Sequence, residues 1–194
     1  MGDVIVRDPA EAAASAHDLI VVGGGVYGTM LTLEAARRGL RPLLVERSDF
    51  GSQTTENSLR IVHGGLRYLQ TMDLRRFRES VRERAWLLET FPGHVRPLEC
   101  FMPLYGEGLR RRWVFAVALA LNEGLARLGG GRNELPPGRT LGPEEAGRVL
   151  GIVPGGGLTG AAVWYDAVME DSERVVIEAL HAACDHGARA LNYV

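Results

Sequence analysis

The stretch "DLIVVGGGVYGTMLTLEAARRG" occupies residues 18–39 and is followed by "RPLLVE" at residues 41–46. The apolar run at its start stops at glycines, which is typical of a strand buried on both faces. The residues after the glycines favour a helix that ends at Gly39, since glycine is common just past a helix C-terminus. A second apolar run follows. The stretch therefore predicts a strand, a glycine turn, a helix and a parallel strand, joined by a right-handed crossover.

Three glycines, Gly23, Gly25 and Gly28, match the pattern G-x-G-x-x-G where the first strand gives way to the helix. In dinucleotide-binding proteins such glycines allow a tight turn, contact between pyrophosphate and backbone, and close packing of helix on strand. The amides at the helix start then face the phosphate charge. Glu46, at the end of the second strand, is expected to bind the hydroxyls of the adenosine ribose, and its charge disfavours NADP.

FAD and NAD share this fingerprint, and the loop after Glu46 favours FAD. Residues 47–58, "RSDFGSQTTENS", are polar, whereas an NAD dehydrogenase would be expected to continue with alternating strands and helices. Such a loop can run back along the pyrophosphate. Its short side chains suit phosphate and ribitol, and the residues predicted to bind FAD here are Arg47, Thr54, Thr55, Asn57, Ser58 and Arg60.

The next stretch, "SLRIVHGGLRYLQ" at residues 58–70, suits neither a plain strand nor a plain helix. Its adjacent glycines, Gly64 and Gly65, cost backbone entropy and have no side chain to pack. Bare backbone usually indicates that another group approaches closely. The stretch is therefore a candidate for contact with a ligand.

The sequence "HGGLRYL" downstream of the fingerprint resembles the FAD-dependent glycerol-3-phosphate dehydrogenases, within the D-amino-acid-oxidase-like flavoproteins. The resemblance implies that His63, Gly64 and Gly65 lie against the isoalloxazine ring. It also implies that Arg67 and Tyr68 face an anionic or hydroxylated substrate, to which they can donate hydrogen bonds. His63 is expected to act either as a general base or as a residue that positions the flavin.

The resemblance is tight over residues 18–70 and looser beyond, where "MEDSERVVIEAL" is similar to the family's Asp-x-x-Arg helix start. The chain differs from the family at three positions before the "HGG" sequence. Glu56 stands where a small residue is usual, and Leu59 and Arg60 stand where the family has small hydroxyl residues and a lysine. Arginine and lysine differ in reach and geometry, so these positions bear on substrate choice.

The expected fold is α/β: an FAD/NAD(P)-binding Rossmann-type domain with the start of an inserted substrate domain. The expected divisions are a leader at 1–16, the FAD-binding βαβ unit and flavin loop at 17–72, and the rest of the FAD domain with the beginning of the substrate domain at 73–194. We also expect the chain to be the N-terminal part of a longer enzyme, because only the first βαβ unit is complete in it.

Further elements follow from hydrophobic spacing. Residues 73–91 predict a helix with one apolar face, formed by Leu74, Phe77, Val81, Leu88 and Phe91, and a solvated face of arginines and glutamates. The glycine- and proline-rich residues 129–142 are expected to be a loop. The remaining predicted elements are helices at 9–16, 113–128, from 143 and at 172–187, and strands at 100–105, 161–166 and from 188, the last with no later element to pair with it.

Composition limits the partners of the chain. Its 194 residues contain 22 arginines and no lysine, and the net charge of −2 gives no general attraction to nucleic acid. Its two cysteines form neither a disulfide framework nor a metal-ligand spacing. Without a signal peptide or an apolar run long enough for a span, a cytoplasmic location is expected. Arg110, Arg111 and Arg112 beside Trp113 are candidates for a peripheral contact with lipid headgroups on the inner face of the membrane.

The expected reaction is FAD-dependent oxidation of a secondary alcohol such as glycerol 3-phosphate, with hydride transfer to flavin N5 and removal of the hydroxyl proton by a base. The expected substrate is a small molecule, with or without a phosphate group. A membrane quinone is a candidate electron acceptor. Two alternatives stay open. One is an amine or amino-acid oxidase of the same superfamily, and the other is a flavin-binding module without catalysis.

Overall fold

The computed structural model describes residues 5–66, 68, 71, 73–108, 111–128, 135–151 and 156–194, with the backbone alone for 125–128. The chain divides into two compact units, of which the first comprises residues 1–60 and 169–194 and the second residues 61–168. These break points differ from the boundary expected after residue 72. The reason is that the last strand pairs with a strand of the first unit, which returns residues 169–194 to it. The division into an FAD part and a substrate part stays a prediction.

The first unit is built on a parallel sheet of order β1-β2-β7. Strand β1 (Leu19–Val22) and strand β2 (Pro42–Val45) flank helix α2 (Val26–Arg37), as predicted. Strand β7 (Arg189–Leu191) lies beside β2. No later element was expected to pair with this last strand, and its partner is an earlier strand of the same unit.

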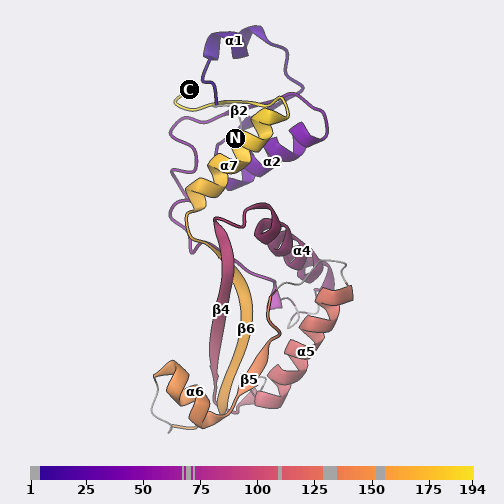
Figure 1. Ribbon diagram of the computed structural model, residues 1–194, viewed down its shortest axis with the longest axis vertical. Helices are drawn as coiled ribbons and strands as arrows, with labels where there is room; N and C mark the ends of the chain where they lie inside the picture. The colour runs from indigo at the N-terminus through magenta and orange to yellow at the C-terminus, as the bar shows by residue number, and fades with distance from the viewer. Residues whose placement is uncertain are drawn as a thin grey trace. The chain divides into compact units, whose positions relative to one another are not determined.

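Helices lie on both faces of this sheet (Figure 1). Helix α7 (Ser172–Asp185) packs on α2, and its Val176 and Leu180 bury the side chain of Leu44 on one face. The short helix α1 (Pro9–Ala14) packs on the other face through Ala12 and Leu43. Successive strand residues point to opposite faces, so a continuous apolar run in β2 serves both layers.

The second unit contains an antiparallel arrangement around strand β6 (Gly160–Met169). Strands β3 (Ile61–Val62) and β5 (Arg139–Leu141) pair antiparallel with opposite ends of β6, and β4 (Val95–Leu104) is its other neighbour. The sequence did not predict β3 or β5. Two- and three-residue strands carry no alternation of their own, and they form because β6 supplies hydrogen-bonding partners.

Helix α4 (Leu74–Thr90) lies within the predicted range 73–91, and Asp73 caps its start, since the Asp73 side chain accepts a hydrogen bond from the Arg76 amide at 3.0 Å. Its buried residues are Phe77, Val81 and Arg84, which recur at helical spacing. Two expectations for this helix were wrong. Leu74 is exposed, and Arg84 lies on the buried face rather than among the solvated arginines.

Helix α5 (Arg112–Leu128) is apolar on two sides. Phe115 and Leu119 are buried against β4 and β6. Trp113, Val117 and Leu121, four residues apart along the helix, are 65%, 52% and 57% exposed. A short helix, α6 (Pro143–Leu150), packs through Ala146 against the β5 end of the sheet.

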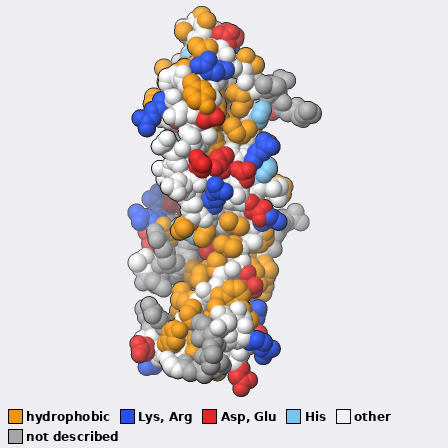
Figure 2. Space-filling view, turned by 90° about the vertical axis from the view of Figure 1, so that its left-hand side faces the viewer, with side chains coloured by type: hydrophobic (Ala, Val, Ile, Leu, Met, Phe, Trp, Pro, Cys, Tyr) orange, Lys and Arg blue, Asp and Glu red, His pale blue; other side chains and the backbone are white. Residues whose placement is uncertain are grey.

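Apolar side chains also reach the surface elsewhere in the second unit. Figure 2 shows hydrophobic atoms at the surface, with charged side chains among them. None of the helices described in the structure combines the length and the apolar composition that crossing a bilayer requires.

Candidate functional site

The glycine fingerprint forms a turn that accepts no larger residue at two of its positions. A Cβ atom built on Gly28 would lie 1.9 Å from the carbonyl oxygen of Gly23, so helix α2 and strand β1 touch backbone to backbone there. A Cβ on Gly24, a glycine that the pattern does not specify, would lie 2.7 Å from Phe50. Gly23 has a φ of 109° and open space beside its α-carbon. The turn is therefore tight on its protein side and open on the other.

Glu46 braces this turn. Its carboxylate accepts hydrogen bonds from the backbone amides of Gly24 and Ser48, each at 2.7 Å. These bonds, chiefly the one from Gly24, hold the pKa of Glu46 below its usual value. A carboxylate that accepts two hydrogen bonds still has lone pairs for hydroxyl donors. Glu46 is thus charged, oriented and able to bind a diol beside the glycines.

The hydroxyl-rich loop folds back to the start of α2. Thr55 Oγ1 accepts a hydrogen bond from the Val26 amide at 3.0 Å, and its carbonyl accepts one from Ser172 Oγ at 2.9 Å. Ser52 Oγ is one of two buried side-chain oxygens in the described part of the chain that have no hydrogen-bond partner. The sequence interpretation did not select Ser52, although it lies in the same hydroxyl-rich run.

These elements enclose a pocket of about 290 Å³. It brings together the predicted residues Gly23, Gly25, Gly28, Glu46, Thr54 and Thr55, and adds Val22, Val26, Tyr27, Gly51, Ser52 and Gln53. The orphaned Ser52 hydroxyl, the open side of Gly23 and the oriented carboxylate fit a ligand with phosphate and ribose groups.

Four residues of the 47–60 stretch that were predicted to bind the cofactor do not line this pocket. Arg47, Asn57 and Ser58 are exposed. Arg60 adopts the left-handed conformation with a φ of 57°, and its guanidinium contacts the Glu170 carbonyl oxygen at 3.0 Å and the Glu173 carboxylate at 3.3 Å. In this structure Arg60 therefore connects the end of the loop to the start of α7.

The glycines of "HGG" have neighbours within the second unit. A Cβ on Gly64 would lie 2.0 Å from Nη1 of Arg84. Gly65 has a φ of 76°, and a Cβ there would lie 2.9 Å from the ring of Tyr68 and 3.0 Å from Ser80. Packing and backbone conformation thus explain both glycines without a ligand. The contact with an isoalloxazine ring stays a prediction.

Arg84 and Asp166 form a buried ion pair that the sequence interpretation missed. Their side chains are 5% and 10% exposed, and Arg84 Nη1 lies 3.0 Å from Asp166 Oδ1. Burial lowers the pKa of the Arg84 guanidinium, and Asp166 opposes that shift. The available signal was spacing, because Arg84 follows Phe77 and Val81 on the apolar side of α4.

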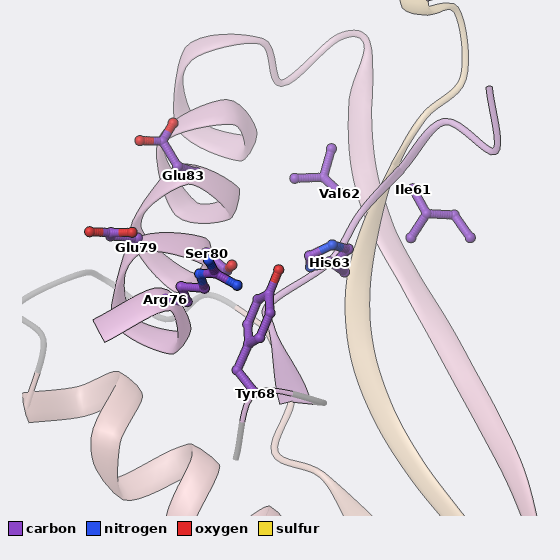
Figure 3. Close-up of a pocket in the computed structure, with 8 residues that line it drawn as sticks. All are labelled: Ile61, Val62, His63, Tyr68, Arg76, Glu79, Ser80 and Glu83. Carbon is purple, nitrogen blue, oxygen red and sulfur yellow. The ribbon is translucent and has the colours of Figure 1, made fainter. Parts of the chain in front are cut away.

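A second pocket, of about 360 Å³, lies between the β3 segment and α4 (Figure 3). Tyr68 lies between His63 and Ser80 there, and the rings of His63 and Tyr68 meet edge to face with centroids 6.1 Å apart. The predicted Arg67 lies outside the described residues. The lining residues are Ile61, Val62, His63, Tyr68, Arg76, Glu79, Ser80 and Glu83.

Comparison with known proteins places this geometry in a family. The FAD dependent oxidoreductases, abbreviated DAO, match residues 18–194. The chain belongs to this family. As a member, it shares 38% identity over 189 residues with a glycerol-3-phosphate dehydrogenase of Synechocystis sp., which covers 97% of this chain and 34% of that protein. The chain spans about a third of the length of the curated relatives it matches.

Solved structures share the fold of this family member. A glycerol-3-phosphate dehydrogenase from Bacillus halodurans complexed with FAD aligns with a TM-score of 0.63 at 23% identity, over 94% of this chain and 27% of that one. An L-proline dehydrogenase from P. horikoshii aligns with a TM-score of 0.66 at 18% identity, over 92% and 44%. At such identities the likeness shows the fold alone.

Proposed function

We propose that the protein binds FAD with the pyrophosphate at the N-terminal turn of α2. The pocket formed by the fingerprint glycines and the buried, unpartnered Ser52 hydroxyl supports this assignment. Glu46 binds the ribose hydroxyls through the lone pairs that its two backbone hydrogen bonds leave available. When bound, FAD supplies a two-electron acceptor.

The proposed substrate is a secondary alcohol of the glycerol 3-phosphate type. The observation that carries this choice is the 38% identity to a glycerol-3-phosphate dehydrogenase over nearly the whole chain. In the proposed reaction the alcohol loses a hydride from its carbinol carbon and a proton from its hydroxyl, and a ketone forms.

Residues of the second pocket would orient this substrate. The Tyr68 hydroxyl can donate a hydrogen bond to an alcohol or phosphate oxygen. Arg67, which lies outside the described residues, stays a candidate for binding the anionic group of the substrate. His63, beside Tyr68, either accepts the hydroxyl proton or holds the cofactor in place. On the α4 side of the pocket, Glu79 and Glu83 contribute negative charge and Arg76 contributes positive charge.

The test is anaerobic reduction of flavin bound to the purified protein. Glycerol 3-phosphate should bleach the flavin absorbance, whereas glycerol, L-proline and glycine should not. Tyr68→Phe should raise KM or lower kcat with flavin still bound, and Tyr105→Phe, an exposed tyrosine, should do neither. Bleaching by an amino acid alone would indicate an amine oxidase. Flavin that no substrate reduces would indicate a binding module.

We also infer a peripheral membrane contact through α5. The exposed row of Trp113, Val117 and Leu121 is an apolar stripe, and the exposed Arg111 precedes the helix. Apolar residues with an interfacial tryptophan and basic neighbours suit an anionic bilayer surface. Such a contact on the inner face of the membrane would bring the enzyme close to a quinone as electron acceptor.

A further inference from the structure

One carboxylate in the second unit accepts hydrogen bonds from three residues that are far apart in the sequence. Asp166, on β6, accepts the Gly64 amide at 2.6 Å and the Arg84 guanidinium at 3.0 Å through Oδ1. Its Oδ2 accepts the indole N–H of Trp164 at 2.9 Å. Both oxygens are engaged, so the carboxylate is held in one orientation and presents a fixed acceptor to the Gly64 backbone.

Arg84 reaches this point from α4. Its Nη1 also donates to the Tyr165 carbonyl oxygen at 2.8 Å, which fixes the guanidinium plane against β6. The guanidinium fills the volume that a side chain at position 64 would need, with Nη1 only 2.0 Å from an ideal Cβ there. The Gly64 backbone is therefore held by the hydrogen bond that its amide donates to Asp166 and by contact with Arg84.

Stability alone does not account well for such a pair. A buried ion pair costs much desolvation, and apolar residues of similar size often stabilise a fold as well or better. What charged groups add is direction, because a carboxylate accepts a backbone amide from a defined angle and a guanidinium donates in a fixed plane. Here the carboxylate and the guanidinium are both directed at the backbone of Gly64, next to His63.

We propose that Arg84 and Asp166 are positioning residues that set the conformation of the segment His63–Gly65 and so aim His63 into the second pocket. The inference that the pair holds this segment rests on the observed contacts alone. Its consequence for turnover rests on the proposed function, in which His63 contacts substrate or cofactor.

The first measurement is hydrogen–deuterium exchange, which needs neither flavin nor activity. The variants are Asp166→Asn, Arg84→Met and Arg84→Lys. The control is Leu141→Ala, which opens a cavity in a separate cluster of the same unit. The readout is the exchange rate of residues 61–66 divided by that of β4, which corrects for global unfolding.

Asp166→Asn and Arg84→Met should raise this ratio about tenfold, because the Gly64 amide loses its charged acceptor or the packing above it. Arg84→Lys should raise it less, since lysine keeps the charge without the planar fork. Leu141→Ala should leave the ratio unchanged. An unchanged ratio in both Asp166→Asn and Arg84→Met would overturn the proposal.

The second measurement is turnover of glycerol 3-phosphate with an artificial dye. With FAD bound to each variant, Asp166→Asn and Arg84→Met should lower kcat about tenfold or more, with little change in KM, because misplacement of a catalytic group acts on the chemical step. Arg84→Lys should recover part of the loss, and Leu141→Ala should keep the wild-type kcat. A wild-type kcat in variants whose segment exchanges faster would refute the positioning role. A wild-type protein without turnover counts against the proposed function, and the exchange ratio then decides whether the pair holds the segment.

Discussion

Replacing Gly28 by alanine should disrupt both the first unit and its pocket. The new Cβ would lie 1.9 Å from the Gly23 carbonyl oxygen, 3.1 Å from the Gly23 carbonyl carbon and 3.3 Å from Val21 Cγ1. Since nonbonded heavy atoms are most stable about 3.5 Å apart, the start of α2 must move by roughly 1.5 Å. The nearest atoms belong to the backbone of a tight turn, so no side-chain rotation can relieve the overlap.

Over-packing of this kind costs about 1–3 kcal/mol, and we expect a value near 3 because backbone must shift. For a chain of this size that loss lowers the melting temperature by about 6–12 °C. The shift also separates the amides at the start of α2 from Glu46, so flavin affinity should fall about tenfold or more. Thermal melting followed by circular dichroism and titration with FAD would measure the two effects.

Gly124→Ala is the matched control, because Gly124 is exposed on α5 with no atom within 4 Å of an added Cβ. The same methyl group there should stabilise the protein by about 0.5–1 kcal/mol, since alanine is the better helix former. If Gly28→Ala melted within 2 °C of the wild type and bound flavin equally well, the argument from close strand–helix contact would be refuted.

Three further expectations can be checked directly. Glu46→Ala should weaken FAD binding about tenfold or more in a fluorescence titration, because a charged hydrogen-bond acceptor for the ribose is lost, whereas Glu34→Ala, an exposed partner of Arg38 on α2, should not. The pKa of Asp18 is lowered from 3.8 to about 2, chiefly by its side-chain hydrogen bond from Arg41; its stabilisation is thus present above about pH 4 and lost as the pH falls toward 2. The gap in urea midpoint between wild type and Asp18→Asn should accordingly be full at pH 6 and shrink at pH 3, and a gap that stays constant would contradict this account. Trp113→Ala should reduce cosedimentation with vesicles containing anionic lipid, and equal binding by wild type and variant would exclude α5 as the membrane contact.

Local sequence determined the first βαβ unit of this protein. The strand at 19–22, the helix at 26–37 and the strand at 42–45 follow from apolar runs, glycines and helix formers that are neighbours in the chain. The helix starts at Asp73 and Asp171 are local features for the same reason, because an N-cap bonds an amide three residues further along the chain. The fingerprint and Glu46 were recognisable because the glycine turn and the strand end lie a fixed number of residues apart.

Tertiary structure decided the features that join distant parts of the chain. Asp166 meets Gly64 across 102 residues and Arg84 across 82. Strand β7 returns to β2, and β3 and β5 exist only because β6 pairs with them. Neither composition nor periodicity reveals which buried charge will meet which backbone amide, since that depends on how separate elements pack. The "HGG" segment shows the difference. Its two glycines predicted from sequence that another group lies close to the backbone, and only the folded chain identified Arg84 as such a group.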